Sequence, residues 1–216
     1  MQVLLVGGGP VDLPLLRREL AQGPDLIIAA DSGGKYLHDI GRPPHILLGD
    51  FDSLNREIVR EMSDTGVEVF TYPAAKDQTD LELAVDMSLA RGATEVRIIG
   101  GLGGRLDHTL GNIGLLLKAY QQGVPAFLID SRQEVTVTDG AIRIPGEVGM
   151  GLSLIPLTLK VSGVTTTGLK FPLNNADLLS IQTLGIHNEY IENMAEITLR
   201  EGILLIISFK ERSPVY

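Results

Sequence analysis

Six short apolar runs, separated by amphipathic stretches, constrain the fold of this chain more than any other feature. Each run is continuously apolar, which is typical of strands covered on both faces. The runs are Val3–Val6, Leu26–Ala30, Ile46–Leu48, Val67–Thr71, Val96–Ile99 and Ala126–Ile129. Helical patterns lie between them, at Pro14–Gln22, Gly33–Asp39, Arg56–Thr65, Asp80–Arg91 and His108–Gln121. This strand–helix alternation predicts an α/β fold, a mainly parallel sheet flanked by helices.

The helix predicted at Asp80–Arg91 has the clearest signals. Its apolar residues recur at spacings of three and four and form one stripe. Thr79 and Glu82 match a capping box at its start, and Gly92 stands where glycine commonly ends a helix.

The pattern changes after residue 131, where helical periodicity gives way to short strands between glycines and prolines. Glu196–Leu199 and Ile203–Phe209 flank Arg200-Glu201-Gly202, a composition that predicts a β-hairpin. Such spacing predicts a small antiparallel β-sandwich or barrel. We therefore divide the chain into an α/β domain, residues 1–131, and an all-β domain, residues 132–216. The other predicted strands are Glu134–Thr138, Ala141–Ile144, Leu152–Leu157 and Leu159–Val164.

Composition excludes several classes of function. The 216 residues carry a formal net charge of −9, which argues against binding to bulk nucleic acid. The absence of cysteine excludes disulfides, thiolate zinc sites and cysteine nucleophiles. No apolar stretch approaches the roughly 20 residues of a membrane span, and the N-terminus lacks the basic region of a signal peptide. We expect a cytoplasmic protein.

Carboxylates follow several of the predicted strands. Asp31 follows Leu26–Ala30, Asp50 and Asp52 follow Ile46–Leu48, and Asp77 and Asp80 come soon after Val67–Thr71. Ligands of open parallel sheets bind outside the carboxyl ends of the strands, so these segments can converge on one crevice. The P-loop pattern is absent, and Gly7-Gly8-Gly9 lacks the third glycine of the dinucleotide fingerprint.

Asp50 and Asp52 suit a Mg²⁺ site, since this cation is usually held by a few carboxylates together with substrate phosphates. Two residues apart in extended chain, they point to the same side. The alternative is an exposed turn, because aspartate and serine favour turns. Asp77 and Asp80 have an alternative as well, which is to cap the helix that follows them.

A glycine-rich segment, Gly100–Gly104, follows another strand and is followed by Arg105, Asp107 and His108. Backbone N–H groups of such a loop can approach phosphates closely, and Arg105 adds a bidentate cation. The alternative is a flexible loop in which Asp107 caps the helix. His108 is interpreted as a helix-start residue rather than a catalytic base.

At these residues the sequence resembles the thiamine pyrophosphokinase (thiamine diphosphokinase) family. The resemblance runs in order from residue 30 to residue 189. Its segments are Ala30–Gly34, Gly49–Ser53, Lys76–Glu82, Gly103–His108, Gly168–Leu173 and Leu184–Glu189. It implies an ATP-binding catalytic domain, then a β domain that helps to bind thiamine, in a homodimer with its sites between subunits.

The resemblance also implies roles for individual residues. The Mg²⁺ ligands would be Asp50, Asp52 and Asp80, and Arg105 and Asp107 would complete the catalytic set. The β domain would contribute His187 and Asn188 to thiamine, together with Asp107. Where the family often has an aromatic residue near the thiamine ring, this chain lacks tryptophan, which leaves Tyr190 or Phe171. The implied ATP-binding residues are Asp31, Lys76, Asp77, Thr79, Gly101, Gly104 and Arg105.

The expected reaction is diphosphate transfer from ATP to the hydroxyl of thiamine, with Mg²⁺ as cofactor, giving thiamine diphosphate and AMP. Two alternatives remain at this point. One is transfer to another hydroxymethyl heterocycle, such as a pterin. The other is a nucleotide-binding module without turnover, against which the intact set of acidic residues and Arg105 argues.

Overall fold

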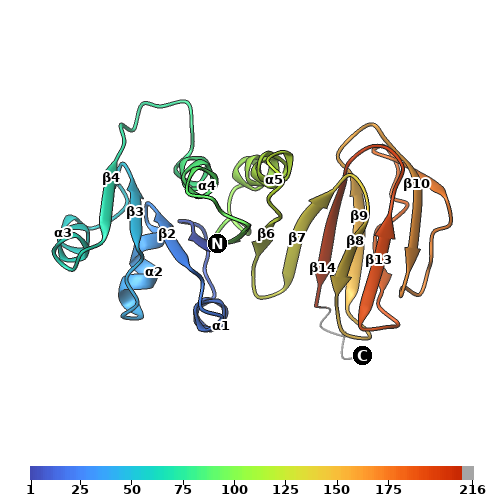
Figure 1. Ribbon diagram of the computed structural model, residues 1–216, viewed down its shortest axis with the longest axis horizontal. Helices are drawn as coiled ribbons and strands as arrows, with labels where there is room; N and C mark the ends of the chain where they lie inside the picture. The colour runs from blue at the N-terminus through green and yellow to red at the C-terminus, as the bar shows by residue number, and fades with distance from the viewer. Residues whose placement is uncertain (211–216) are drawn as a thin grey trace. The chain divides into compact units, whose positions relative to one another are not determined.

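The computed structural model describes residues 1–210, and the chain divides into two compact units, Met1–Ser131 and Arg132–Tyr216 (Figure 1). The first unit alternates strands and helices, and the second is built of strands. The two are described separately below. Among the helices of residues 1–210, none combines the length and the apolarity that crossing a bilayer requires.

The first unit contains a parallel sheet whose strands follow the order β6-β5-β1-β2-β3-β4. Val3 of β1 lies opposite both Leu26 of β2 and Val96 of β5, so β1 is paired on both sides. The predicted strands are all present, with ends that differ by at most one residue. They are β1 Gln2–Val6, β2 Leu26–Ala30, β3 Ile46–Gly49, β4 Glu68–Thr71, β5 Glu95–Ile99 and β6 Ala126–Ile129.

Helices cover both faces of this sheet. Apolar residues of α1, α2 and α3 join one buried cluster with those of β1, β2 and β3, among them Leu16, Leu37 and Leu47. The helices α4 and α5 lie together on the opposite face (Figure 1). The bounds are α1 Leu13–Ala21, α2 Gly33–Asp39, α3 Arg56–Asp64, α4 Asp80–Ala90 and α5 Leu106–Gln121.

The order of the strands reverses between β1 and β5. From β1 the chain adds β2, β3 and β4 on one side, and then returns to add β5 and β6 on the other. A reversal of this kind leaves two neighbouring strand ends whose loops diverge, which is where open α/β sheets bind ligands. Gly7–Gly9 and Gly100–Gly104 follow the two strands at this point.

The second unit has two antiparallel sheets. One contains β12-β9-β14-β7 and the other β11-β10-β13-β8. A buried cluster, which includes Leu152, Val164, Tyr190 and Ile206, lies in the second unit. The bounds are β7 Gln133–Thr138, β8 Ile142–Pro145, β9 Gly151–Pro156, β10 Lys160–Thr167, β11 Ala176–Leu179, β12 Asn188–Glu189, β13 Met194–Thr198 and β14 Leu204–Phe209.

The predicted hairpin in this unit is wrong. β13 pairs with β8 and β10, whereas β14 pairs with β7 and β9, so the two strands belong to different sheets. The intervening Arg200 and Glu201 pair instead with Ser162 of β10. The segment therefore carries the chain from one sheet to the other, and each strand gains partners on both sides that a hairpin would not provide.

Candidate active site

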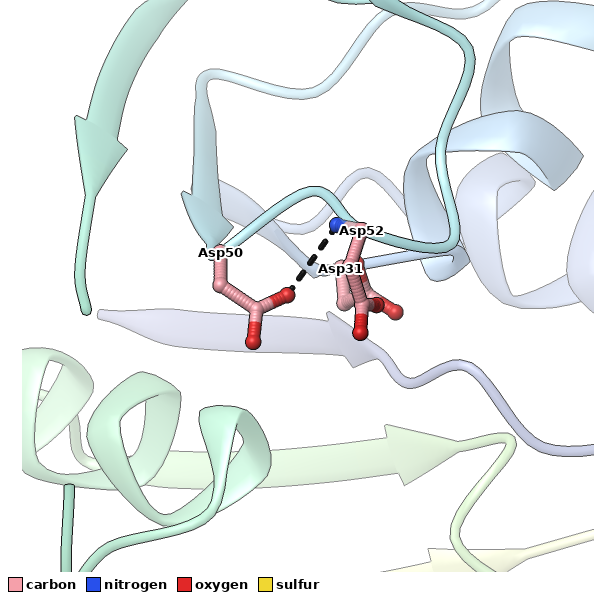
Figure 2. Close-up of side chains that lie close together, drawn as sticks. All are labelled: Asp31, Asp50 and Asp52. Carbon is pink, nitrogen blue, oxygen red and sulfur yellow. Dashed lines mark hydrogen bonds between the residues drawn. The ribbon is translucent and has the colours of Figure 1, made fainter. Parts of the chain in front are cut away.

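Three aspartates meet at the carboxyl ends of β2 and β3. One oxygen from each of Asp31, Asp50 and Asp52 lies within 4.8 Å of the others. Figure 2 shows the three carboxylates, with Asp50 Oδ1 accepting a hydrogen bond of 3.1 Å from the backbone N–H of Asp52. The trio thus contains two of the predicted metal ligands and, in place of Asp80, Asp31.

The reason given above for the closeness of Asp50 and Asp52 is wrong, although they are close. Phe51 between them has φ +59°, so the chain turns there and is not extended. The turn lets the backbone of Asp52 approach the side chain of Asp50. Asp31 also has a positive φ, of +46°. Backbone strain of this kind at non-glycine residues is common at ligand sites.

The carboxyl group of Asp31 lies in an unfavourable environment for a negative charge. Burial raises its pKa above the ordinary value of 3.8, and the charges of Asp80, Asp50 and Asp52 raise the pKa further. A hydrogen bond from the backbone of Ser32 lowers the pKa in part. Its Oδ1 is shielded from solvent and has no hydrogen-bond partner within residues 1–210. A buried oxygen of this kind is rare unless a ligand completes it.

These strand ends surround a cavity of about 450 Å³ in the first unit. It is lined from four loops, after β1, β2, β3 and β5, and from the segment that leads into α4. Asp52 and Asp77 are not among its lining residues, and both are exposed. The predicted site residues that line it are Asp31, Asp50, Lys76, Thr79, Asp80, Gly101, Gly104 and Arg105.

Lys76 and Asp80 face each other inside this cavity. Lys76 Nζ lies 3.0 Å from Asp80 Oδ1, and the two side chains are only 16% and 22% exposed. Asp80 is the first residue of α4, where Thr79 Oγ1 accepts from the N–H of Glu82 at 3.1 Å. The predicted N-cap is confirmed; the Glu82 carboxylate, however, lies 3.0 Å from Lys118 of α5.

Arg105 and Asp107 form a second ion pair, at the start of α5. The guanidinium meets the carboxylate with two contacts, Nε–Oδ1 at 3.1 Å and Nη2–Oδ2 at 2.5 Å. This hydrogen bonding lowers the pKa of Asp107 and raises that of Arg105. The helix begins at Leu106, so Asp107 lies in its first turn and is not the N-cap considered above.

The glycines after β1 and β5 pack against each other. Gly7 and Gly9 donate hydrogen bonds of 2.8 and 3.0 Å to Ile99 and Gly100. Gly100 has φ +76°, and a Cβ on it would lie 2.5 Å from the carbonyl oxygen of Gly7. These glycines are thus required for the close approach of two loops, while Gly104 faces open space.

Several lining residues were not predicted as site residues. Gly7, Gly8 and Gly9 line the cavity although they fail the dinucleotide pattern; their position after the first strand was the available signal. Asn112 of α5 is buried, and its Nδ2 donates to Gly101 O at 2.8 Å. His108 lines this cavity and also a second one of about 270 Å³, to which Asp107 belongs.

In the second unit, the side chain of Asn188 is engaged with its own chain. Its Oδ1 accepts from the backbone N–H of Phe171 at 3.0 Å and of Glu189 at 2.9 Å. Its Nδ2 donates to the carbonyl oxygen of Phe171 at 2.7 Å. Asn188 therefore holds the segment around Phe171, with its oxygen and one amide hydrogen already used.

The neighbouring aromatic residues differ sharply in accessibility. Tyr190 is completely buried, so it cannot serve as the aromatic residue beside a ligand. Phe171 is 61% exposed, with Lys170 Nζ 5.8 Å from its ring centre. His187 is exposed and has φ +62°. Its ring and that of Phe209 meet edge to face, with 6.0 Å between the ring centres.

The donor set of the first unit fits a hard divalent cation. Oxygens of Asp31, Asp50 and Asp52 lie close together, and the shielded Oδ1 of Asp31 has no hydrogen-bond partner within the described residues. Mg²⁺ takes oxygen ligands of this kind and draws its remaining ligands from water and phosphates. Without a positive ion, carboxylates so close together repel one another.

Comparison with known proteins places this chain in a family. Residues 18–128 match the family model described as "Thiamin pyrophosphokinase, catalytic domain", and residues 141–204 match "Thiamin pyrophosphokinase, vitamin B1 binding domain". Thiamine pyrophosphokinase of Bacillus subtilis is 34% identical over 94% of this chain and 96% of its own. Thiamin pyrophosphokinase 1 of Caenorhabditis elegans is 28% identical over 80% of this chain and 72% of its own.

Solved structures agree. That of thiamine pyrophosphokinase from Bacillus subtilis has a TM-score of 0.87 and 32% identity, covering 98% of this chain and 100% of its own. That from Geobacillus thermodenitrificans has a TM-score of 0.86 and 33% identity, covering 99% of each. The mixed fold thus has its counterpart in proteins of clear sequence similarity, and this chain belongs to the thiamine pyrophosphokinase family.

Proposed function

We propose that this protein transfers the diphosphate group of ATP to the hydroxyl group of thiamine, forming thiamine diphosphate and AMP. The hydroxyl oxygen bonds to the β-phosphorus, the bond from that phosphorus to the oxygen of AMP breaks, and the hydroxyl proton is released. The observation that carries the proposal is the strand-end cavity, with its shielded carboxylate oxygens, in a chain of this family.

The nucleotide end of the reaction belongs to the first unit. Lys76 and Arg105 line the cavity and supply positive charge for a chain of phosphates. Gly104 has open space in front of its Cα position, so a phosphate can approach its backbone there. Little covalent chemistry is required of such a site, since positioning and fixed charges provide most of the acceleration.

The carboxylates would hold Mg²⁺, with Asp31, Asp50 and Asp52 as the compact trio and Asp80 beside Asp31. When bound, the cation would neutralise charge on the phosphate oxygens. Asp107 is the acid proposed to orient the hydroxyl group of the acceptor. Its ionised form is favoured by the two contacts from Arg105, so it acts as a hydrogen-bond acceptor.

The acceptor end involves the second unit. Phe171 is the accessible aromatic side chain of the two that the sequence offered, and its ring can pack against a heterocycle. Asn188 supports Phe171 through two hydrogen bonds, and its oxygen, which also accepts from the N–H of Glu189, is not used for the substrate. His187 remains an exposed candidate for a polar contact.

We further propose a cytoplasmic homodimer whose sites form between subunits, as the resemblance implied. Light scattering of the purified protein measures the oligomeric state. Mixing Asp52→Asn with Phe171→Ala then tests the joint site, because heterodimers would contain one intact site. Failure to regain activity despite demonstrated subunit exchange would favour sites within a single chain.

The deciding experiment measures AMP release with Mg²⁺–ATP and three acceptors, which are thiamine, oxythiamine and a pterin alcohol. We expect thiamine to be the best acceptor and thiamine diphosphate to be the product detected by mass spectrometry. Preference for the pterin alcohol would overturn the acceptor but retain the reaction. ATP binding without AMP release for any acceptor would favour a non-catalytic module.

A further inference from the structure

Lys76 is placed to neutralise the carboxylate cluster while no nucleotide is bound. It lies four residues before Asp80, and both side chains line the cavity. Its Nζ lies 3.0 Å from Asp80 Oδ1 and also donates to the carbonyl oxygen of Pro73 at 3.2 Å. With 16% of its side chain exposed, Lys76 is much more enclosed than a surface lysine.

The contact between Lys76 and Asp80 is an attraction of charges without the alignment of a hydrogen bond. Asp80 Oδ1 is shielded from solvent and has no hydrogen-bond partner among residues 1–210, although an ammonium group lies beside it. A carboxylate oxygen has two lone pairs, so Asp80 Oδ1 can accept a further ligand beside the ammonium group. A pair of this kind can be exchanged, because breaking it disrupts no aligned bond.

The other charges around the cavity leave Lys76 as the cation for this task. Asp80 lies close enough to Asp31 for its negative charge to raise the pKa of Asp31, and Asp31 belongs to the carboxylate trio. Arg105, the other cationic side chain that lines the cavity within the described residues, is held by two contacts to Asp107. Lys76 thus faces the acidic cluster, whereas Arg105 is neutralised by its own partner.

We propose that Lys76 is the resident counter-ion of Asp80 in the nucleotide-free protein, and that it changes partner from Asp80 to a phosphate oxygen when nucleotide and divalent cation bind. This proposal rests on the proposed function, since it needs a nucleotide and a cation at this site. Lys76 is then a positioning residue with two roles. It prevents the empty cluster from capturing divalent cations, and it supplies charge to the phosphates afterwards.

The proposal predicts effects of opposite sign for two ligands. In Lys76→Met, the nucleotide-free protein should bind Mn²⁺ about tenfold more tightly, because a positive charge next to the site is lost. The same variant should bind α,β-methylene-ATP, measured at a saturating concentration of Mg²⁺, about tenfold more weakly, because a charge-assisted contact is lost. If Lys76 had only a structural role, its replacement would weaken the binding of both ligands or of neither.

Isothermal titration calorimetry and Mn²⁺ electron paramagnetic resonance measure these affinities. Lys35→Met is the matched control, since Lys35 also pairs with an aspartate four residues later, Asp39, but on the exposed surface of α2. Its affinities should equal those of the unchanged protein. Lys76→Gln, which is neutral but polar, should behave like Lys76→Met and guards against a defect caused by the apolar methionine.

The Mn²⁺ titration decides the proposal. Equal or weaker Mn²⁺ binding by both Lys76 variants, including no binding by any protein, overturns it. Thermal unfolding of each variant verifies that the fold is intact. The proposed function is tested separately by formation of thiamine diphosphate in the unchanged protein, so the failure of one proposal is distinguishable from the failure of the other.

Discussion

The two units treat their polar candidate residues in opposite ways. In the first unit, Asp31 keeps a shielded oxygen with no hydrogen-bond partner among residues 1–210, and the shielded oxygen of Asp80 has only the Lys76 ammonium beside it, without an aligned hydrogen bond. In the second, the Oδ1 of Asn188 accepts two backbone hydrogen bonds, and its Nδ2 donates a third. From the sequence, all three residues were predicted to contact a ligand.

The difference separates carboxylate oxygens without a hydrogen bond from an amide whose hydrogen bonds hold its own chain. An unsatisfied buried carboxylate destabilises the empty protein, so it persists where a ligand completes it. A satisfied amide contributes to stability with or without a ligand. Substitutions in the first unit should therefore affect activity more than stability, and Asn188 should show the reverse.

The largest expected effect is on activity, from Asp50→Asn. We expect a loss of about 10³-fold in kcat, because a charge that the transition state requires is removed. The free energy of unfolding without Mg²⁺ should not fall, since the change removes repulsion within the trio. Steady-state kinetics and urea unfolding measure the two quantities. Asp64→Asn, on the exposed surface of α3, is the control; near-normal activity of Asp50→Asn would contradict the role of the trio.

The next effect is on stability, from Asn188→Ala. This change removes the hydrogen bonds that the Asn188 side chain makes to the N–H and the C=O of Phe171. We therefore expect the free energy of unfolding to fall by about 2 kcal/mol. Urea unfolding measures this. Asn174→Ala, in an exposed loop of the same unit, should change it little. If Asn188→Ala lost activity but kept full stability, Asn188 would be a ligand contact and the comparison would fail.

Asp31→Asn should change the dependence of stability on pH. The raised pKa of Asp31 means that the folded state binds this proton more tightly than the unfolded state. Asp31 therefore contributes stability that is fully present below pH 3.8, its ordinary pKa, and that is lost as the pH rises through the raised value. In EDTA, Asp31→Asn should be the more stable protein at pH 7, with the advantage absent at pH 3. An equal difference at both pH values would contradict this origin.

The smallest effect is expected from Tyr190→Phe. The Tyr190 hydroxyl lies 3.5 Å from Ser208 Oγ, which is a long contact, so its loss should lower the free energy of unfolding by less than about 1 kcal/mol. The KM for thiamine should be unchanged, because the ring is completely buried. Phe171→Leu, at the exposed aromatic position, should raise that KM. A rise for Tyr190→Phe alone would reverse our choice between them.

Local patterns were sufficient for most of the first unit. Continuous apolar runs such as Leu26–Ala30 predicted strands because a parallel strand must be apolar on both faces. Thr79 predicted the start of α4 because its hydroxyl satisfies an N–H of the first turn. The second unit was predicted less well. The short strands β11 and β12 were missed. In addition, β13 and β14 were assigned to one hairpin, because turn composition does not identify the partner of a strand.

The sequence by itself determined which residues are candidates for the chemistry, since Asp50, Asp52, Lys76 and Arg105 stand in recognisable segments after strands and before helices. The tertiary structure alone decided their partners. Asp31 joins the trio because β2 and β3 are neighbours, and Phe51 turns the chain so that Asp52 meets Asp50. Asn188 reaches Phe171, 17 residues away, through the folded chain. Such contacts depend on strand pairing and backbone turns that join residues far apart in the sequence, and a local pattern of residues carries no information about them.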